Sequence, residues 1–319
     1  AHQNLIKNYM EKKTAEYFEK LKKRIPKNLK IEKVSKENIN LANEYLKTRK
    51  NLEFKFSPLS SHFGENWDYD EHPLGYFMRN TDDNKIVGFL GTICSRRFIQ
   101  GKEIVCCNLV HWFVEKEFRV FAYAFFFPLM EREIIVYATT PRESIIGIYK
   151  KFNFDITIAK YTAGIGINFL TFFSKNFYRF SIIKNKDEIL EELNHEDRKI
   201  FQEHKKYNCI NILIKDKSNQ LKPSYLLIKK SRRYNLNVLD ILYFSNLGEY
   251  KKYAPEICTK ICLSFLNIFI GQLYFNTENK LIYNPNFLLK TIDKFYPIKT
   301  LNGSSFFDYL YSDVVMFDN

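Results

Sequence analysis

The chain has 319 residues, of which 45% are hydrophobic and 17% aromatic, with only 11 glycines and 9 prolines. This composition excludes an intrinsically disordered or collagen-like chain and supplies core material for two domains of ordinary size. The 49 Lys and Arg exceed the 36 Asp and Glu, for a formal net charge of +13. No single basic run dominates, so the charge permits phosphate-bearing ligands without indicating nucleic acid.

The cysteines predict a reducing environment rather than a disulfide framework or a metal site. The six lie mostly inside apolar stretches, without a C-x-x-C pair and without a histidine at metal-finger spacing. We therefore expect buried thiols, no bound metal and a cytoplasmic protein. The longest apolar runs fall well short of the roughly 20 residues that cross a bilayer, so no membrane span is expected.

The first predicted element is a basic amphipathic helix from Gln3 to Arg24, which Pro26 ends. Acidic residues lie among its lysines, so we expect it to pack on the body of the protein or on a second subunit, as in a homodimer, rather than to bind a membrane or nucleic acid. A strand follows from Leu29 to Val34, and a second helix begins after Ser35 and Asn38.

Beyond a loop-rich segment from Phe54 to Pro73, hydrophobic periodicity predicts strands and then alternating helices. Three strands with hairpin-type turns are expected to form an antiparallel meander: Leu74 to Arg79, Ile86 to Arg97 and Glu103 to Val114. The elements predicted next are a helix from Val120 to Arg132, a strand from Glu133 to Thr140, a helix from Arg142 to Lys151, a strand from Asp155 to Ala163 and a turn at Gly164 to Gly166. Pro128 is expected to distort the first of these helices.

The most informative point is the junction between the strand ending at Val114 and the helix beginning near Val120. Such a junction presents unpaired backbone N–H groups and the positive end of the helix dipole. It therefore favours the binding of an anion.

The residues of this junction resemble the GNAT superfamily of acyl-CoA-dependent N-acyltransferases. In that family a strand ending Val-x-Pro-Glu-Tyr-Arg precedes a pyrophosphate loop, Arg/Gln-x-x-Gly-x-Gly/Ala, which opens a helix. The matching stretches are Val114 to Arg119 and Arg119 to Ala124. A later helix end, Ile148 to Phe154, is similar to the family's Leu-Tyr-Glu-Lys-x-Gly-Phe. The resemblance covers roughly Leu29 to Gly166.

Four positions depart from the family pattern. Lys116 replaces proline, Ala122 replaces a loop glycine, Arg142 stands where asparagine is frequent, and Asn153 replaces the glycine after the last helix. Asparagine is the next best residue at a left-handed helix C-cap, so the last change is mild. Ala122 adds one methyl group where the backbone is expected to approach a pyrophosphate.

The resemblance implies an α/β (α+β) protein of the GNAT fold, with a mixed, mostly antiparallel central sheet flanked by helices. It also implies a bulge in the strand just before the loop, so that side-chain alternation fails past His111. Acyl-CoA is the implied co-substrate. The residues expected to bind it are Phe113, Val114, Arg119, Val120, Phe121, Ala122, Tyr123, Ala124 and Arg142.

Acyl transfer from a thioester to an amine needs a base for the amine and an acid for the departing thiolate. Tyr149 occupies the family's position for the acid. His111 is the best-placed base, because a histidine ordinarily titrates near neutrality, and His72 is the second candidate. Asn108 is expected to orient the acceptor or the acyl carbonyl. A tyrosine at this position could also serve only in packing. The histidine could serve only in a structural hydrogen bond. If water relays the amine proton, the enzyme needs no dedicated base.

The segment from Phe54 to Pro73 lies where the family closes over its acceptor. Trp67 offers an apolar face there, and Asp70 and His72 offer hydrogen bonds, so we expect these three to bind substrate. A solvated polar loop would explain the same residues, and the sequence leaves both interpretations open.

The second half of the chain echoes the first. The tetrapeptide Ser95 to Phe98 returns as Ser231 to Tyr234, and Asp240 then occupies the position of Asn108. The elements expected there are a helix from Glu249 to Leu266, a strand from Phe269 to Asn276, a helix from Asn286 to Phe295 and strands to Phe317. We predict two GNAT-like domains, residues 1–170 with the acyl-CoA site and residues 171–319 without a CoA loop.

The predicted function is transfer of an acyl group from acyl-CoA to the amine of a nucleotide-linked amino sugar. Large two-half members that resemble this chain include bacterial enzymes that acylate nucleotide-linked amino sugars for surface polysaccharides such as lipopolysaccharide. A Fem-like transferase of peptidoglycan synthesis, which takes aminoacyl groups from tRNA, is the alternative enzyme. A non-catalytic GNAT-like binding module is the alternative from another class.

Overall fold

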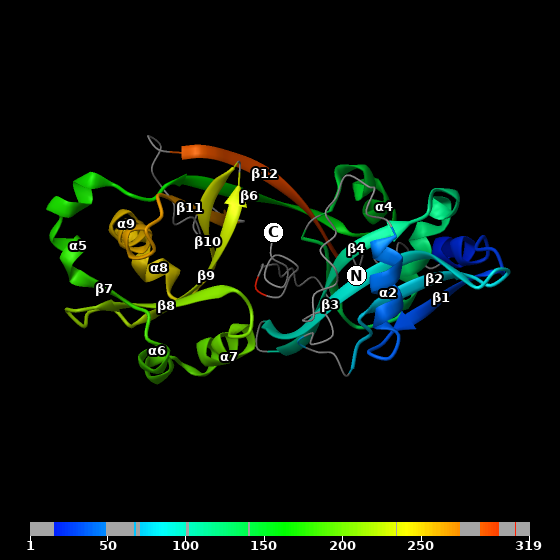
Figure 1. Cartoon of the computed structure of the whole chain (residues 1–319), viewed down its shortest axis with the longest axis horizontal. Helices are drawn as coiled ribbons and strands as arrows, with labels where there is room; N and C mark the ends of the chain where they lie inside the picture. The colour runs from blue at the N-terminus through cyan, green and yellow to red at the C-terminus, as the bar shows by residue number, and fades with distance from the viewer. Residues whose placement is uncertain are drawn as a thin grey trace, which may run out of the picture. The chain divides into compact units, whose positions relative to one another are not determined.

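The computed structural model describes residues 16–48, 67, 71–99, 102–139, 141–233, 235–274, 288–299 and 310. The chain divides into two compact units (Figure 1): unit 1 holds Ala1–Val136 with Leu301–Ser304, and unit 2 holds Tyr137–Thr300 with Ser305–Asn319. The domains expected from the repeat, 1–170 and 171–319, would divide the chain at a later residue, and they stay a prediction.

Unit 1 is built on an antiparallel meander in which each strand pairs with its neighbour in sequence. Its strands are β1 (Leu29–Val34), β2 (Gly75–Asn80), β3 (Lys85–Ile99) and β4 (Lys102–Val114). The predicted first strand and meander are therefore confirmed. Residues 16–22 are helical, which confirms the end of the predicted N-terminal helix, and its earlier part lies outside the described residues. The second predicted helix is α2 (Ile39–Lys47).

Helices cover both faces of the unit 1 sheet. On one face, the ring of Tyr45 in α2 lies 6.0 Å from that of Phe113 in β4. On the other, the ring of Trp112 lies 5.2 Å from that of Phe126, in the helical segment that follows β4. This segment consists of η2 (Lys116–Phe126), a 3₁₀ helix, and α3 (Phe127–Met130).

The single helix predicted from Val120 to Arg132 is therefore wrong in both its start and its type. Pro128 has no N–H to donate, and it lies in the first turn of α3, where no intrahelical donor is needed. The proline thus begins a new helix instead of distorting an existing one. The phenylalanines from 125 to 127 are buried.

Unit 2 contains a sheet in which only β10 and β11 run parallel among the described pairs. The strand order is β12-β6-β11-β10-β9-β8-β7. The strands are β6 (Asp155–Ile165), β7 (Phe180–Ile183), β8 (Cys209–Asp216), β9 (Ser224–Arg233), β10 (Leu236–Phe244), β11 (Phe269–Tyr274) and β12 (Leu288–Lys299). The short β5 (Ile135–Tyr137) spans the boundary between the units.

Helices also cover both faces of the unit 2 sheet. They are η3 (Glu143–Ile145), α4 (Ile146–Lys151), η4 (Phe169–Phe173), α5 (Lys175–Arg179), α6 (Lys186–Glu192), α7 (His195–His204), α8 (Leu247–Tyr250), η5 (Lys251–Tyr253) and α9 (Ala254–Ser264). Ile257 and Ile261 of α9 share a buried core with Leu239 of β10. On the opposite face, Phe201 of α7 packs against Tyr225 of β9. The predicted mixed, mostly antiparallel sheet flanked by helices is therefore confirmed.

Three sequence predictions in unit 2 are wrong. The helix expected from Asn286 to Phe295 is instead strand β12, which pairs with β6. The turn expected at Gly164 to Gly166 is the end of β6, and a Cβ on Gly166 would lie 2.3 Å from the sulfur of Cys262, so the glycine permits close approach of α9. The helix expected from Glu249 to Leu266 is divided into α8, η5 and α9. The strands expected up to Phe317 lie outside the described residues.

A disulfide joins Cys94 of β3 to Cys107 of β4. These cysteines are direct partners across the two strands, so the prediction of free buried thiols is wrong for this pair. Among the remaining cysteines, Cys106, Cys258 and Cys262 are buried and form no disulfide, as expected.

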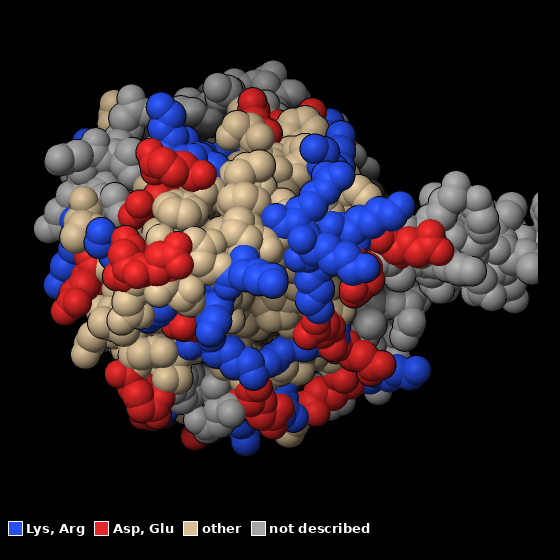
Figure 2. All heavy atoms as spheres, turned by 90° about the vertical axis from the view of Figure 1, so that its right-hand side faces the viewer, with Lys and Arg blue, Asp and Glu red and all other residues tan. Residues whose placement is uncertain are grey.

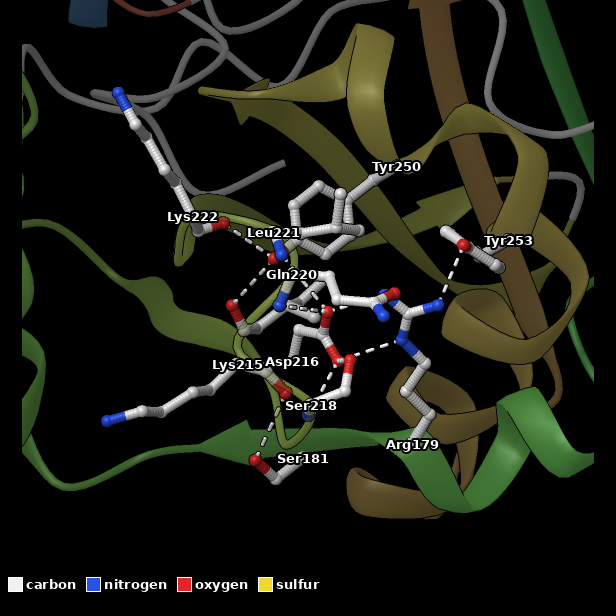
Figure 3. Close-up of polar contacts among 11 residues, drawn as sticks. Arg179, Ser181, Lys215, Asp216, Ser218, Gln220, Leu221, Lys222, Tyr250 and Tyr253 are labelled. Atoms are coloured by element: carbon white, nitrogen blue, oxygen red, sulfur yellow. Dashed lines mark hydrogen bonds and ion pairs between the residues drawn. The ribbon is translucent and has the colours of Figure 1, made fainter.

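One buried ion pair ties together three connections of unit 2 (Figure 3). The carboxylate of Asp216, at the end of β8, accepts hydrogen bonds from Nε and Nη2 of Arg179 at 2.8 and 2.6 Å. It also accepts the backbone N–H groups of Ser218, Gln220 and Leu221, which shapes the turn toward β9. Arg179 donates further to the hydroxyl of Tyr253, in η5, at 2.9 Å. Together these bonds fix the end of α5.

Candidate functional site

Strand β4 bulges at the position that the resemblance implies. Val110 pairs with Gly91 and Phe113 pairs with Phe89, so two residues of β4 lie opposite one residue of β3. His111, one of the two, has a φ of 50°, in the left-handed region that side-chain-bearing residues seldom adopt. Such bulges redirect side chains and are frequent next to active sites. The prediction that alternation fails past His111 is confirmed.

The bulge separates the environments of the candidate side chains on β4. Before it, Asn108 is fully buried and pairs with Ile93 of β3. At the bulge, His111 is half-buried as a residue, and its Nε2 is buried. After it, Phe113 packs on α2 and Val114 is buried. His111 is therefore the titratable candidate on this strand with partial access to solvent.

The turn after β4 presents cations and the start of η2 to solvent. Glu115 precedes η2 and its N–H bonds to the carbonyl of Val87 on β3 at 2.8 Å. Lys116 and Arg119 are exposed, and Val120 has 68% of its surface exposed. Arg119 is oriented by a hydrogen bond from its Nε to the carbonyl oxygen of Val114 at 3.2 Å. The turn thus places two cations, and also the carboxylates of Glu115 and Glu117, at the N-terminus of an 11-residue helix.

The rest of the loop that was predicted to bind acyl-CoA is largely buried. Ala122 and Ala124 are 7% and 0% exposed, so the methyl group of Ala122 does not project into solvent. Phe121 is half-buried. Tyr123 donates its hydroxyl to the carbonyl of Leu21, and burial raises its pKa while Arg24 opposes this effect. Tyr123 therefore anchors the N-terminal helix against η2.

The N-terminal helix adds further cations to unit 1. Lys23 and Arg24 are exposed, and Lys22 forms an ion pair with Glu131 at 3.1 Å. Figure 2 looks onto the side that carries β1 and β2 and shows Lys and Arg side chains gathered in one broad group, with Asp and Glu at its margins. A phosphate-bearing ligand would be attracted to such a surface.

The predicted acceptor residues are only partly described. Trp67 is half-buried in a turn, and Asp70 lies outside the described residues. His72 is half-buried, and its Nδ1 lies 2.7 Å from Nη1 of Arg132. Because a guanidinium can only donate, Nδ1 of His72 accepts and its ring is neutral with the proton on Nε2. The adjacent Glu71 forms an ion pair with Arg96 of β3.

Two predicted site residues belong to unit 2. Tyr149 in α4 is 2% exposed, its ring lies 5.1 Å from that of Phe154, and burial raises its pKa above the ordinary value. Arg142 is exposed immediately before η3. Asn153 has a φ of 57°, which confirms the predicted left-handed position after the helix. The roles of Tyr149 and Arg142 stay predictions.

A buried polar cluster in unit 2 was missed from the sequence. Asp240 of β10 is 4% exposed and accepts hydrogen bonds from the hydroxyls of Tyr161 and Ser231, at 2.6 and 2.5 Å. Lys229, also 4% exposed, is its direct partner on β9. A Cβ on Gly271 would lie 2.2 Å from Oδ1 of Asp240. The echo of Asn108 by Asp240 was the signal that could have located this cluster.

No group of three or more His, Cys, Asp or Glu within the described ranges could hold a metal ion. No helix in the same ranges is long and apolar enough to cross a membrane.

No protein-family model matches the sequence, and no curated protein matches it. The fold has solved counterparts. A GCN5-related N-acetyltransferase from Anabaena variabilis is 13% identical, with a TM-score of 0.55 over 86% of this chain and 73% of its own. One from Kribbella flavida is 9% identical, with a TM-score of 0.54 over 85% and 70%. A GCN5-related glucosamine N-acetyltransferase region of a fungal multi-domain β-N-acetylglucosaminidase is 10% identical, with a TM-score of 0.53 over 86% and 38%. The chain therefore has the GNAT fold.

Proposed function

We propose that the protein is an acyl-CoA-dependent N-acyltransferase that acts on the amine of a nucleotide-linked amino sugar in surface polysaccharide biosynthesis. The observation that carries this proposal is the bulge at His111 followed by the exposed start of η2 with Arg119, on a GNAT fold. Exposed cations of unit 1, among them Lys23, Arg24 and Lys116, suit a co-substrate and an acceptor that both carry phosphate.

Acyl-CoA would be held chiefly by the turn after β4. Backbone N–H groups near Phe113 and Val114 would bond the pantetheine arm, and the start of η2 with Arg119 would bind the pyrophosphate. The bond from Arg119 to the carbonyl of Val114 uses Nε and leaves the two terminal nitrogens to donate to phosphate oxygens. Ala122 stands where the family has a loop glycine. Because Ala122 is buried, its methyl group would not obstruct the pyrophosphate.

The acyl transfer itself forms a C–N bond and breaks the C–S bond of the thioester. We assign His111 to accept the proton of the attacking amine, because this residue is half-buried at the bulge rather than enclosed in the sheet. We retain Tyr149 as the proposed acid for the thiolate on the family resemblance alone; it belongs to unit 2, and burial raises the pKa of its phenol above the ordinary value. Asn108 is too buried for direct contact with an acceptor, so we retain it only as support for the strand.

The amino sugar is proposed as the acceptor because Trp67 and His72 combine an apolar face with a hydrogen-bond donor, as sugar-binding sites do. His72 is held in place by Arg132 through its Nδ1. The glucosamine acetyltransferase region among the structural neighbours has an acceptor of the same chemical class.

We further propose that unit 2 contains a degenerate GNAT-like half. Strands β8, β9 and β10 form an antiparallel meander, β10 has a register shift between Ile241 and Tyr243, and helices then lead to β11, which runs parallel to β10. The turn that starts at Asn246 lacks the arginine of the η2 loop, so this half would have no CoA site.

Calorimetry and a thiol-release assay test the proposal in sequence. CoA is expected to bind the wild type, and Arg119→Glu is expected to abolish binding. Arg198→Glu is the matched control, because Arg198 is also exposed and also donates to a backbone carbonyl, that of Leu190. Equal loss in both variants, or no CoA binding by the wild type, refutes the cofactor assignment. CoA binding without thiol release on any nucleotide-linked amino sugar refutes the acceptor alone.

A further inference from the structure

Unit 2 exposes a group of large apolar side chains on η4 and α5, which we name the η4 surface. The exposed fractions are 74% for Phe169, 77% for Leu170, 89% for Phe173 and 64% for Tyr178. Single exposed apolar residues are ordinary on a folded protein, but a contiguous group of this kind marks an interaction site.

The backbone beneath the η4 surface is held firmly, so the exposed side chains are displayed and not merely disordered. The N–H of Asn168 bonds to Oγ1 of Thr259 at 3.0 Å, and Oγ of Ser174 donates to Glu256 at 2.9 Å, both in α9. Figure 1 shows α5 beside α9, in agreement with these bonds. At the end of α5, Arg179 is fixed by the ion pair described above.

The chain segment that bears the η4 surface carries basic residues and no carboxylate of its own. Residues 156–186 contain no Asp or Glu and five basic residues, which are Lys160, Lys175, Arg179, Lys184 and Lys186. Lys175 is exposed between Phe173 and Tyr178, and Nζ of Lys260 lies 4.2 Å from the centroid of the Phe177 ring. The two carboxylates bonded to this segment, Glu256 and Asp216, are both buried.

We propose that the η4 surface docks on a lipid bilayer that carries anionic headgroups. Phe169, Leu170 and Phe173 enter the headgroup region, and Lys175 meets lipid phosphates. A bilayer offers an apolar layer beneath a plane of negative charge, which is the complement of apolar tips with a cationic margin. A second copy of the chain fits less well, because a two-fold interface would place this acid-free segment against itself. The inference does not rest on the acyltransferase proposal.

Vesicle sedimentation of the full chain tests this docking. The wild type is expected to sediment with vesicles of phosphatidylcholine mixed with phosphatidylglycerol, and much less with phosphatidylcholine alone. Leu170→Ser and Phe173→Ser together are expected to weaken that binding at least about tenfold, and Lys175→Glu several-fold, with the effect of charge reduced by salt. These side chains are exposed, so thermal unfolding of the variants is expected to match the wild type.

Ile158→Ser is the matched control, because Ile158 is a 51% exposed apolar residue on β6, away from η4 along the strand. It is expected to bind vesicles as the wild type does. The proposal is overturned if the wild type stays in the supernatant with both vesicles, or if Ile158→Ser loses as much binding as the η4 variants. It is also overturned if light scattering finds a dimer that Phe173→Ser dissociates, since the surface is then a protein interface.

Discussion

Replacement of Asp216 by Asn is expected to destabilise unit 2 by an amount well above that of a surface ion pair. The Asp216 side chain is fully buried and accepts six hydrogen bonds, two from Arg179 and the others from the turn 218–221. Asn keeps the shape but loses the charge, and its NH₂ group faces donors. Removal of one partner of a buried pair costs roughly 3–5 kcal/mol. The guanidinium of Arg179 is 18% exposed and recovers some water, so we expect about 3 kcal/mol.

The pH dependence gives this prediction a second readout. The hydrogen bonds from Arg179 hold the pKa of Asp216 well below its ordinary 3.8. A carboxyl whose pKa is lower in the folded state stabilises the fold above its unfolded pKa, and this stabilisation is lost as the pH falls through the folded value. The difference between wild type and Asp216→Asn is therefore expected to be constant near neutrality and to shrink below about pH 4.

Urea unfolding followed by circular dichroism measures both effects. Glu192→Gln serves as the control, because Glu192 pairs with Lys215 at 2.6 Å with both side chains more than a third exposed. That change is expected to cost less than about 1 kcal/mol. A loss for Asp216→Asn no larger than that of the control, or a difference that persists unchanged in acid, would refute the reasoning.

Three further outcomes are expected. Gly271→Ala would place a methyl group against Asp240 and is expected to cost about 1–3 kcal/mol in urea unfolding, whereas Gly248→Ala, which meets nothing within 4 Å, is expected to be neutral or slightly stabilising. Because Asn153 has a left-handed backbone, Asn153→Ala is expected to lower the free energy of unfolding by about 1–2 kcal/mol, which appears as a lower thermal midpoint. Asn153→Gly is expected to leave the midpoint nearly unchanged. Tyr149→Phe is expected to lower kcat about 100-fold with CoA affinity retained in calorimetry, and an unchanged kcat would remove Tyr149 from the mechanism.

The local parts of the fold were predictable because they follow from short-range patterns. Alternation and hairpin turns located the meander of unit 1, and the family resemblance located the bulge at His111. Asparagine's tolerance of the left-handed region predicted the backbone of Asn153. Each of these depends on a few neighbouring residues, so the sequence carries the information.

The parts that could not be predicted depend on partners distant in the chain. Residues 288–295 have helix-compatible composition, yet they form β12 because β6 offers an edge to pair with. Gly166 was predicted to lie in a turn, but a glycine is needed there because the sulfur of Cys262 in α9 leaves no room for a side chain. The sequence pointed to Asp240 only through its correspondence with Asn108 in the repeat, because its partners Tyr161 and Ser231 come from two other strands. Tertiary contacts override local propensity at all of these positions.

The pairing of β6 with β12 has a consequence for the order of events during synthesis. Asp155 pairs with Ile298 and Gly164 with Leu288, so β6 leaves the ribosome long before this partner exists. One edge of β6 must then stay unpaired while more than a hundred residues are translated. During this time, strands of neighbouring nascent chains can pair with that edge. The pairing of β6 with β12 is therefore a late step of folding that closes a long loop. The yield of folded protein in the cell is expected to depend on how quickly β12 is synthesised or on a chaperone that covers the unpaired edge of β6.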